Sequence, residues 1–309
     1  MMAEIAPRIV LSLDFELRWG RHDRLGLDRE AYRENLEAER DAVPAMLEML
    51  TERGLRATWA TVGAVGCRDW REYFARAPRP PRYRNAAHAV DRRYAELDPK
   101  GELHFAPELV GRIVRSPGQE LGTHTFSHLP LREPGVGQDD VAADLAAVAA
   151  LWSELSDGPP RSLVFPRNQW AFLETVRQGG IRVWRGNPRP WFFDRNEEAT
   201  RGIAIRALKL LSDANPVARH AAPLEGDMTR ASLFLRLDLP ALAWRLHLAR
   251  IRRELDALGA GEIFHLWWHP ANVGRGERGL RRVREALDVA ADRCERRGIV
   301  SCTMGELVR

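Results

Sequence analysis

Residues 118–128 read Gly-Gln-Glu-Leu-Gly-Thr-His-Thr-Phe-Ser-His and form the most specific pattern in this chain of 309 residues. We interpret Glu120–Thr123 as a short strand that leads directly into His124, with His128 four positions further along. That spacing places the two imidazoles on one face of a helical turn. Two imidazoles and a carboxylate are a standard ligand set for a hydrolytic divalent metal ion. The stretch therefore predicts a metal site at the end of a strand.

Three other predicted strands also end in polar or catalytic residue types. The clusters are Asp14-Phe15-Glu16, Phe165-Pro166-Arg167-Asn168-Gln169-Trp170 and Trp267-Trp268-His269-Pro270. In a barrel of parallel strands the carboxyl ends share one rim, so residues far apart in sequence converge there. We expect all four clusters to surround one site.

Short apolar runs alternate with stretches of helical periodicity along the whole chain. The predicted strands are Ile9–Leu13, Leu55–Val62, Glu120–Thr123, Ser162–Phe165, Ile181–Trp184, Glu262–Trp268 and Ile299–Cys302. The predicted helices are Pro44–Arg53, Ala106–Arg115, Asp139–Leu155, Trp170–Arg177, Leu239–Leu258 and Gly279–Arg296. This alternation favours a parallel sheet covered by helices, and seven strands over this length favour a barrel.

We therefore predict an α/β fold, a distorted (β/α)7 barrel, as a single domain over residues 1–309 with inserted loops. Two segments interrupt the pattern. Ala77–His104 is rich in Pro and Arg and is interpreted as an inserted surface loop, whereas Asn187–Asp227 carries mixed signals that assign no elements. Long excursions of this kind are often lids or binding loops.

Composition excludes several classes of protein. The formal net charge is +4, but the basic residues are scattered among acidic ones, so we expect no nucleic-acid partner. No apolar run is long enough to cross a bilayer. Cys67, Cys294 and Cys302 form no Cys-x-x-Cys pair and are interpreted as reduced thiols. The N-terminus lacks the features of a signal peptide, so we expect a cytoplasmic protein. The oligomeric state stays open.

On these motifs the chain resembles the polysaccharide deacetylase family, carbohydrate esterase family 4, with its nodulation-deacetylase homology domain. The segments that carry the resemblance are Ser12–Glu16, Ala57–Gly63, Gly118–His128 and Leu266–Pro270, and they occur in the family's order. The resemblance implies a metal-dependent hydrolase that removes an N-acetyl group from an amino sugar. Its cofactor would be a divalent metal ion, zinc or a similar ion. The metal segment is the most specific of the four.

The resemblance also assigns roles to individual residues. His124, His128 and a carboxylate would bind the metal, Asp14 would be the general base, and His269 would protonate the leaving amine. Family members commonly have two adjacent aspartates in the first motif, and here Phe15 occupies the second place. Because residues two apart in a strand face the same side, Asp14 and Glu16 can share one site. We prefer Glu16 as the metal ligand with Asp14 as the base. The reverse assignment stays open, as does Asp14 as the ligand with Glu16 turned toward the substrate.

Other roles implied by the resemblance are less specific. Arg167 is the candidate for an arginine that steadies the catalytic aspartate, although an alternative register leaves it facing substrate. A backbone N–H in the segment after Pro166 would help to bind the oxyanion. Further candidates are Asp194 and Asp213 for the family's fourth motif, and Trp170, Trp268 and Asp213 for contacts with the sugar. The remaining histidines are interpreted as structural: His88, His104, His220, His247 and His265.

Two alternatives to the deacetylase remain. One is a C–N hydrolase of a small cyclic amide or ureide on the same barrel. The other is a catalytically silent carbohydrate-binding barrel that lost its metal through Phe15. The expected cytoplasmic location makes a polysaccharide or glycan precursor, rather than a mature cell wall, the preferred substrate.

Overall fold

The structure is a computed structural model that describes residues 5–21, 29–194, 202–215, 217–274 and 276–308. Eight strands form one nearly closed, barrel-shaped sheet in the order β6-β9-β1-β2-β3-β4-β5-β7, while β10 pairs with β1 and β8 with β9. From β9 to β7 every neighbouring pair is parallel, and only β6 runs antiparallel to its neighbour. The predicted distorted α/β barrel is confirmed.

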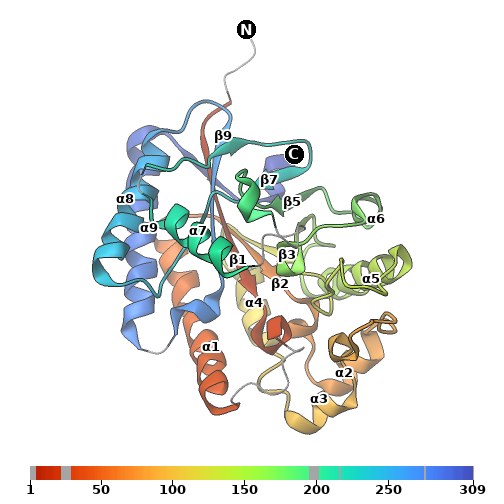
Figure 1. The fold of residues 1–309 in the computed structure, drawn as a ribbon. Helices are drawn as coiled ribbons and strands as arrows, with labels where there is room; N and C mark the ends of the chain where they lie inside the picture. The colour runs from red at the N-terminus through yellow and green to blue at the C-terminus, as the bar shows by residue number, and fades with distance from the viewer. Residues whose placement is uncertain (1–4, 22–28, 195–201, 216, 275, 309) are drawn as a thin grey trace.

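The strands are β1 Arg8–Phe15, β2 Ala57–Thr61, β3 Gln119–Thr123, β4 Ser162–Val164, β5 Val183–Gly186, β6 Ala222–Pro223, β7 Met228–Arg230, β8 Leu233–Phe234, β9 Glu262–Trp268 and β10 Val300–Cys302. The α-helices are α1 Arg29–Glu52, α2 Trp70–Arg76, α3 Arg92–Leu97, α4 Pro107–Arg115, α5 Gln138–Leu155, α6 Leu173–Gln178, α7 Ile203–Ala214, α8 Ala241–Asp256 and α9 Glu277–Arg297. Figure 1 shows α1, α8 and α9 along one side of the sheet and α5 on the opposite side. Over the described residues, no helix is long and apolar enough to span a membrane.

The central strand β1 shows how the barrel is built. Its side chains alternate, so Leu11, Leu13 and Phe15 enter the large apolar core formed with the helices. Val10 belongs instead to a small second core, with residues of β2, β4, β5, β9 and the C-terminal segment. Ser12 and Asp14 lie two and four positions after Val10, so their side chains point to the same face of β1 as Val10. Polar residues at the end of β1 therefore face the barrel interior.

Helix α1 begins earlier than expected. The prediction that a helix begins at Pro44 is wrong, because α1 extends from Arg29 to Glu52 and contains Pro44. Proline in a helix interior removes one backbone hydrogen bond. Here the buried residues Leu36, Val43 and Leu50 lie on both sides of Pro44 along the helix. Burial of this continuous apolar face outweighs the loss at the proline.

The two interrupting segments contain ordered elements. Ala77–His104 is not simply a surface loop, because it includes α3 and buries Tyr94 and the ion pair between His104 and Asp98. Asn187–Asp227 includes α7 and β6, and its residues 195–201 and 216 lie outside the described part of the chain. Predicted boundaries elsewhere differ by a few residues, as for the strand predicted at Ile181–Trp184, which is β5.

Candidate active site

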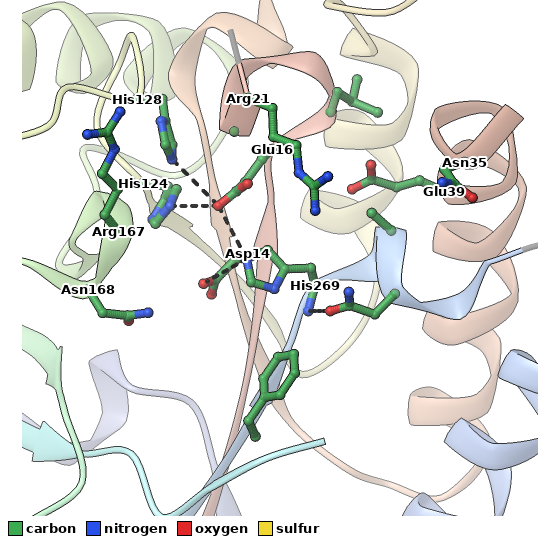
Figure 2. A pocket seen from close by; sticks show the side chains of 15 residues that line it. Asp14, Glu16, Arg21, Asn35, Glu39, His124, His128, Arg167, Asn168 and His269 are labelled. Carbon is green, nitrogen blue, oxygen red and sulfur yellow. Dashed lines mark hydrogen bonds and ion pairs between the residues drawn. The ribbon is translucent and has the colours of Figure 1, made fainter. Parts of the chain in front are cut away.

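A cavity of about 350 Å³ lies where the carboxyl ends of the barrel strands meet (Figure 2). The described residues that line it are Asp14, Glu16, Leu17, Gly20, Arg21, Asn35, Glu39, His124, His128, Arg167, Asn168, Phe234, His269, Ala271 and Asn272. Six of the nine site residues predicted from sequence are in this list. The convergence of separate strand ends therefore holds for the four clusters.

Glu16, His124 and His128, the metal triad, form the first group in the cavity. One ligand atom from each lies within 4.8 Å of the others. Glu16 Oε1 is 3.0 Å from His124 Nε2 and 3.6 Å from His128 Nε2. These are the residues that the sequence proposed as metal ligands, and Figure 2 shows both imidazoles directed at the Glu16 carboxylate.

The environment of His124 fits a metal ligand. Its Nδ1 is 2.7 Å from the Val164 carbonyl oxygen, so Nδ1 is protonated and donates a hydrogen bond to that carbonyl. In the neutral imidazole with this hydrogen bond, the lone pair is on Nε2, the atom that faces the cavity. This Nε2 is buried and, although Glu16 Oε1 lies 3.0 Å away, the two atoms do not meet the geometry of a hydrogen bond. A buried polar atom in that state is costly unless a ligand satisfies it, and a divalent metal would do so.

The segment between the two histidines is not helical. The expectation that a helical turn aligns them is wrong, because Thr125 and His128 adopt left-handed φ angles of 63° and 55°. Asp144 on α5 holds this turn by accepting a 2.6 Å hydrogen bond from the backbone N–H of Phe126. The Thr125 side chain accepts another from the N–H of Leu129. Both imidazoles reach Glu16 through this turn.

Asp14 forms the second group with an arginine that the sequence analysis missed. Arg185 on β5 donates from its two terminal nitrogens to the two carboxylate oxygens of Asp14, at 2.7 and 2.6 Å. Asp14 is 2% exposed and Arg185 1% exposed. A paired fork of this geometry holds a carboxylate in one orientation.

Further contacts fix Arg185. It donates to Ser12 Oγ at 2.9 Å and to Asn168 Oδ1 at 2.9 Å. Its guanidinium also lies 4.0 Å from the ring centroid of Trp267, a cation–π distance. Beneath it, His265 Nε2 is 2.8 Å from Ser12 Oγ. The interior ends of β1, β4, β5 and β9 thus meet in one buried polar network.

His269 connects the two groups. It follows β9, and its Nε2 lies 3.5 Å from Glu16 Oε1 and 3.7 Å from Asp14 Oδ2. Burial alone would lower the pKa of His269, but Glu16 and then Asp14 raise it to about 9. For Glu16, burial would raise the pKa, and the three histidines, His269 first, lower it well below its ordinary value. His269 is therefore positively charged at neutral pH in the metal-free protein.

Glu39 on α1 is a third carboxyl group of the cavity that sequence analysis did not single out. It is 1% exposed, and neither of its carboxylate oxygens has a hydrogen-bond partner. Burial and then the negative charge of Glu16 raise the pKa of Glu39 to about 8. This carboxyl group is therefore mostly neutral at pH 7.

Arg167 lies at the cavity but does not contact Asp14. Its guanidinium is 3.7 Å from Glu133 Oε2 and 3.3 Å from His88 Nδ1. Arg185, and not Arg167, therefore makes the contact expected of the arginine that steadies the aspartate. Arg167 instead faces the cavity, as the alternative register predicted. Within this turn, the Asn168 and Gln169 N–H groups donate to backbone carbonyls, so neither is available to an oxyanion.

The three predicted sugar contacts are not among the described residues that line the cavity. Trp268 is fully buried and donates from its indole nitrogen to Met46 Sδ. Trp170 packs against the main apolar core. Asp213 is buried on α7 and paired with Arg236 at 2.9 Å. The structure brings none of these side chains to the metal triad.

Comparison with known proteins identifies the fold. No protein-family model matches the chain, and no curated protein sequence matches it. A solved structure classed as a polysaccharide deacetylase from Mycobacterium smegmatis is 15% identical, with a TM-score of 0.59 over 100% of this chain and 92% of that chain. The barrel described above is thus the fold of that protein, and the resemblance seen in the sequence is confirmed at the level of the fold.

Two further solved structures are similar. A family 4 carbohydrate esterase from Streptomyces lividans in complex with acetate is 12% identical, with a TM-score of 0.43 over 96% of this chain and 92% of that chain. A pseudoenzyme of the same family from Bacillus anthracis is also 12% identical, with a TM-score of 0.46 over 98% of this chain and 66% of that chain. The fold conclusion rests on the Mycobacterium smegmatis protein, which has the highest TM-score of the three.

Proposed function

We propose that this chain, which has the polysaccharide deacetylase fold, is a metal-dependent hydrolase that removes an N-acetyl group from an amino sugar. The substrate would be a polysaccharide or glycan precursor. The cytoplasmic location expected from the sequence stays a prediction.

The observation that carries the proposal is the metal triad. Its three donor atoms lie within 4.8 Å of one another, and the buried Nε2 of His124 has no hydrogen-bond partner. Two imidazoles and one carboxylate leave coordination positions open, which is typical of catalytic rather than structural sites. When bound there, a divalent ion would polarise the acetyl carbonyl and lower the pKa of the attacking water.

The chain's own groups supply the proton transfers. Asp14, held in one orientation by Arg185, lies beside the metal triad and would accept the proton of the attacking water. His269 is charged at neutral pH in the metal-free protein, and its side chain is 29% exposed, so it can meet a substrate in the cavity. It would donate its proton to the departing nitrogen, which is a poor leaving group without protonation.

The decisive experiment measures metal content and product release together. Metal-free protein is reconstituted with Zn²⁺ and incubated with acetylated nucleotide sugars, acetylated free sugars and cyclic ureides. We expect acetate from an acetylated sugar. Release of ammonia or ring-opened product from a ureide, without acetate, would favour the cyclic-amide hydrolase. Binding of less than about half an equivalent of zinc would favour a silent barrel.

Two variants separate the roles within the site. We expect His128→Ala to lose both metal binding and activity, because it removes a ligand. His269→Ala should retain the metal and lose activity by about 10²–10⁴-fold, the usual contribution of a general acid. Full activity in either variant would contradict the proposed mechanism.

A further inference from the structure

Gly20 lies in the 3-10 turn η1, Leu17–Arg21, which directly follows β1 and Glu16. A Cβ atom built on Gly20 would lie 1.7 Å from Glu16 Oε2 and 2.7 Å from Glu16 Cδ. Gly20 is not among the residues with positive φ, so its backbone conformation does not itself require glycine. The space next to its Cα is occupied by the carboxylate of Glu16.

We propose that Gly20 is a positioning residue for the metal site: the absence of a side chain at position 20 provides the space that holds the Glu16 carboxylate against His124 and His128. This inference rests on the proposed function, since it takes Glu16 as a metal ligand. It identifies Asp14, Glu16 and Gly20 as one unit of sequence, Asp-x-Glu-x-x-x-Gly.

The local structure explains why Glu16 needs this space. Position 15 cannot supply the ligand, because Phe15 is fully buried and its ring packs edge-on against Trp59 at 6.5 Å. Glu16 comes one residue later, where the chain leaves the strand and Leu17 adopts a φ of 48°. The N–H of Trp19 then donates to the Glu16 carbonyl and closes the turn.

This turn brings position 20 beside the Glu16 side chain. Glu16 Oε1 faces the two histidines, whereas Oε2 is the atom nearest to the space at Gly20. Any side chain at position 20 would therefore compete with the carboxylate for the same volume.

The expected damage is confined to the metal ligand. The atom that a new Cβ would meet first is the end of a flexible side chain, which can rotate away at little cost to the fold. At Gly279, by contrast, a Cβ would lie 1.9 Å from the backbone oxygen of Val273, so the fold itself would have to shift. Gly20→Ala should therefore displace Glu16 and leave the barrel intact.

The test is the zinc affinity of metal-free protein, measured by competition with a chromophoric chelator. The variants are Gly20→Ala, Glu16→Ala and the double variant. Gly259→Ala is the matched control, because its Cβ would also approach a glutamate, Glu262, but at an ordinary 3.5 Å from Oε2. Gly259 likewise has no positive φ. The melting temperature of each metal-free variant reports the integrity of the fold.

We expect Gly20→Ala to weaken zinc binding by about 10–100-fold, the usual effect of removing support from a metal ligand. Gly259→Ala should bind zinc as the wild type does. The double variant should match Glu16→Ala, because Gly20 acts only through Glu16. The metal-free melting temperature of Gly20→Ala should be no lower than that of Glu16→Ala, because both changes cost the ion pair between Glu16 and His269.

Three results would overturn the inference. They are wild-type zinc affinity in Gly20→Ala, a further loss of affinity when Gly20→Ala is added to Glu16→Ala, and a lower melting temperature in metal-free Gly20→Ala than in metal-free Glu16→Ala. In each of these cases, weaker zinc binding by Glu16→Ala than by the wild type would still support the proposed function. Failure of the proposed function is distinct, since the wild type itself would then bind no zinc.

Discussion

The metal triad and the group around Asp14 are neighbours in one cavity, but they differ in how their polar atoms are satisfied. Both carboxylate oxygens of Asp14 are paired with Arg185, whose terminal nitrogens also donate to Ser12 and Asn168, and only its buried Nε has no hydrogen-bond partner. In the metal triad, the buried atom without a hydrogen-bond partner is the Nε2 of His124, which is one of the proposed ligand atoms. The charges of the first group are therefore balanced within the protein, whereas a ligand would satisfy the second.

This difference indicates which interactions belong to the fold and which belong to the function. A buried ion pair stabilises only while both partners are present, since removing one leaves an uncompensated charge. A buried histidine nitrogen without a hydrogen-bond partner costs stability until a ligand binds, and the ligand then stabilises the folded state by mass action. The two groups should therefore respond differently to mutation and to zinc.

The largest expected effect on stability comes from Arg185. Arg185→Met leaves Asp14 buried without its partner, and we expect metal-free protein to lose about 3–5 kcal/mol of unfolding free energy in urea. Adding Asp14→Asn should restore much of the loss, because the unpaired charge disappears. Zinc should raise the melting temperature of the wild type and not of His128→Ala. A small loss in Arg185→Met, under about 1 kcal/mol, would contradict the description of this pair as part of the fold.

The next effect concerns Glu39 and pH. The pKa of Glu39 rises from its ordinary 4.5 to about 8 in the folded protein. Below pH 4.5 the carboxyl group is protonated in both states and carries no penalty. Between these values only the unfolded state ionises, so stability falls as pH rises and levels off above about pH 8. A change of one pKa unit corresponds to about 1.4 kcal/mol, which makes the total loss a few kcal/mol.

Glu39→Gln isolates this contribution. Glutamine has nearly the same shape and cannot ionise, so the variant should gain stability over the wild type as pH rises from 5 to 8. Glu48→Gln, exposed on the same helix, should follow the wild type throughout. The measurement is urea unfolding of metal-free protein at several pH values. Parallel curves for wild type and Glu39→Gln would show that Glu39 ionises normally.

Much of this site could be predicted from the sequence because its residues follow strands. His124 and His269 each come directly after a predicted strand, His128 lies four positions beyond His124, and parallel strand ends must meet. The two-residue periodicity of a strand likewise placed Asp14 and Glu16 on the same side. In each case a local pattern determines where the side chain lies.

Arg185, Glu39 and Gly20 could not be assigned in this way. Arg185 lies inside β5, but the predicted strand ended one residue earlier, at Trp184. The sequence signal for Arg185 was its position two residues after Val183, which places both side chains on the inward face of the strand. Glu39 is one of several acidic residues on α1, and only the packing of α1 on the barrel buries it. The role of Gly20 depends on where the Glu16 side chain lies, and that position is determined by the tertiary structure.

The smallest effect separates the two arginines at the cavity. Because Arg185 rather than Arg167 contacts Asp14, Arg167→Ala should raise KM about tenfold, near 1.4 kcal/mol, and change kcat by less than about threefold. Arg132→Ala, exposed in a neighbouring loop, is the control and should alter neither constant. A pure fall in kcat would instead mean that Arg167 acts in the transition state. That result would make both arginines part of the acid–base chemistry, with no difference in role between the residue that holds Asp14 and the one that faces substrate.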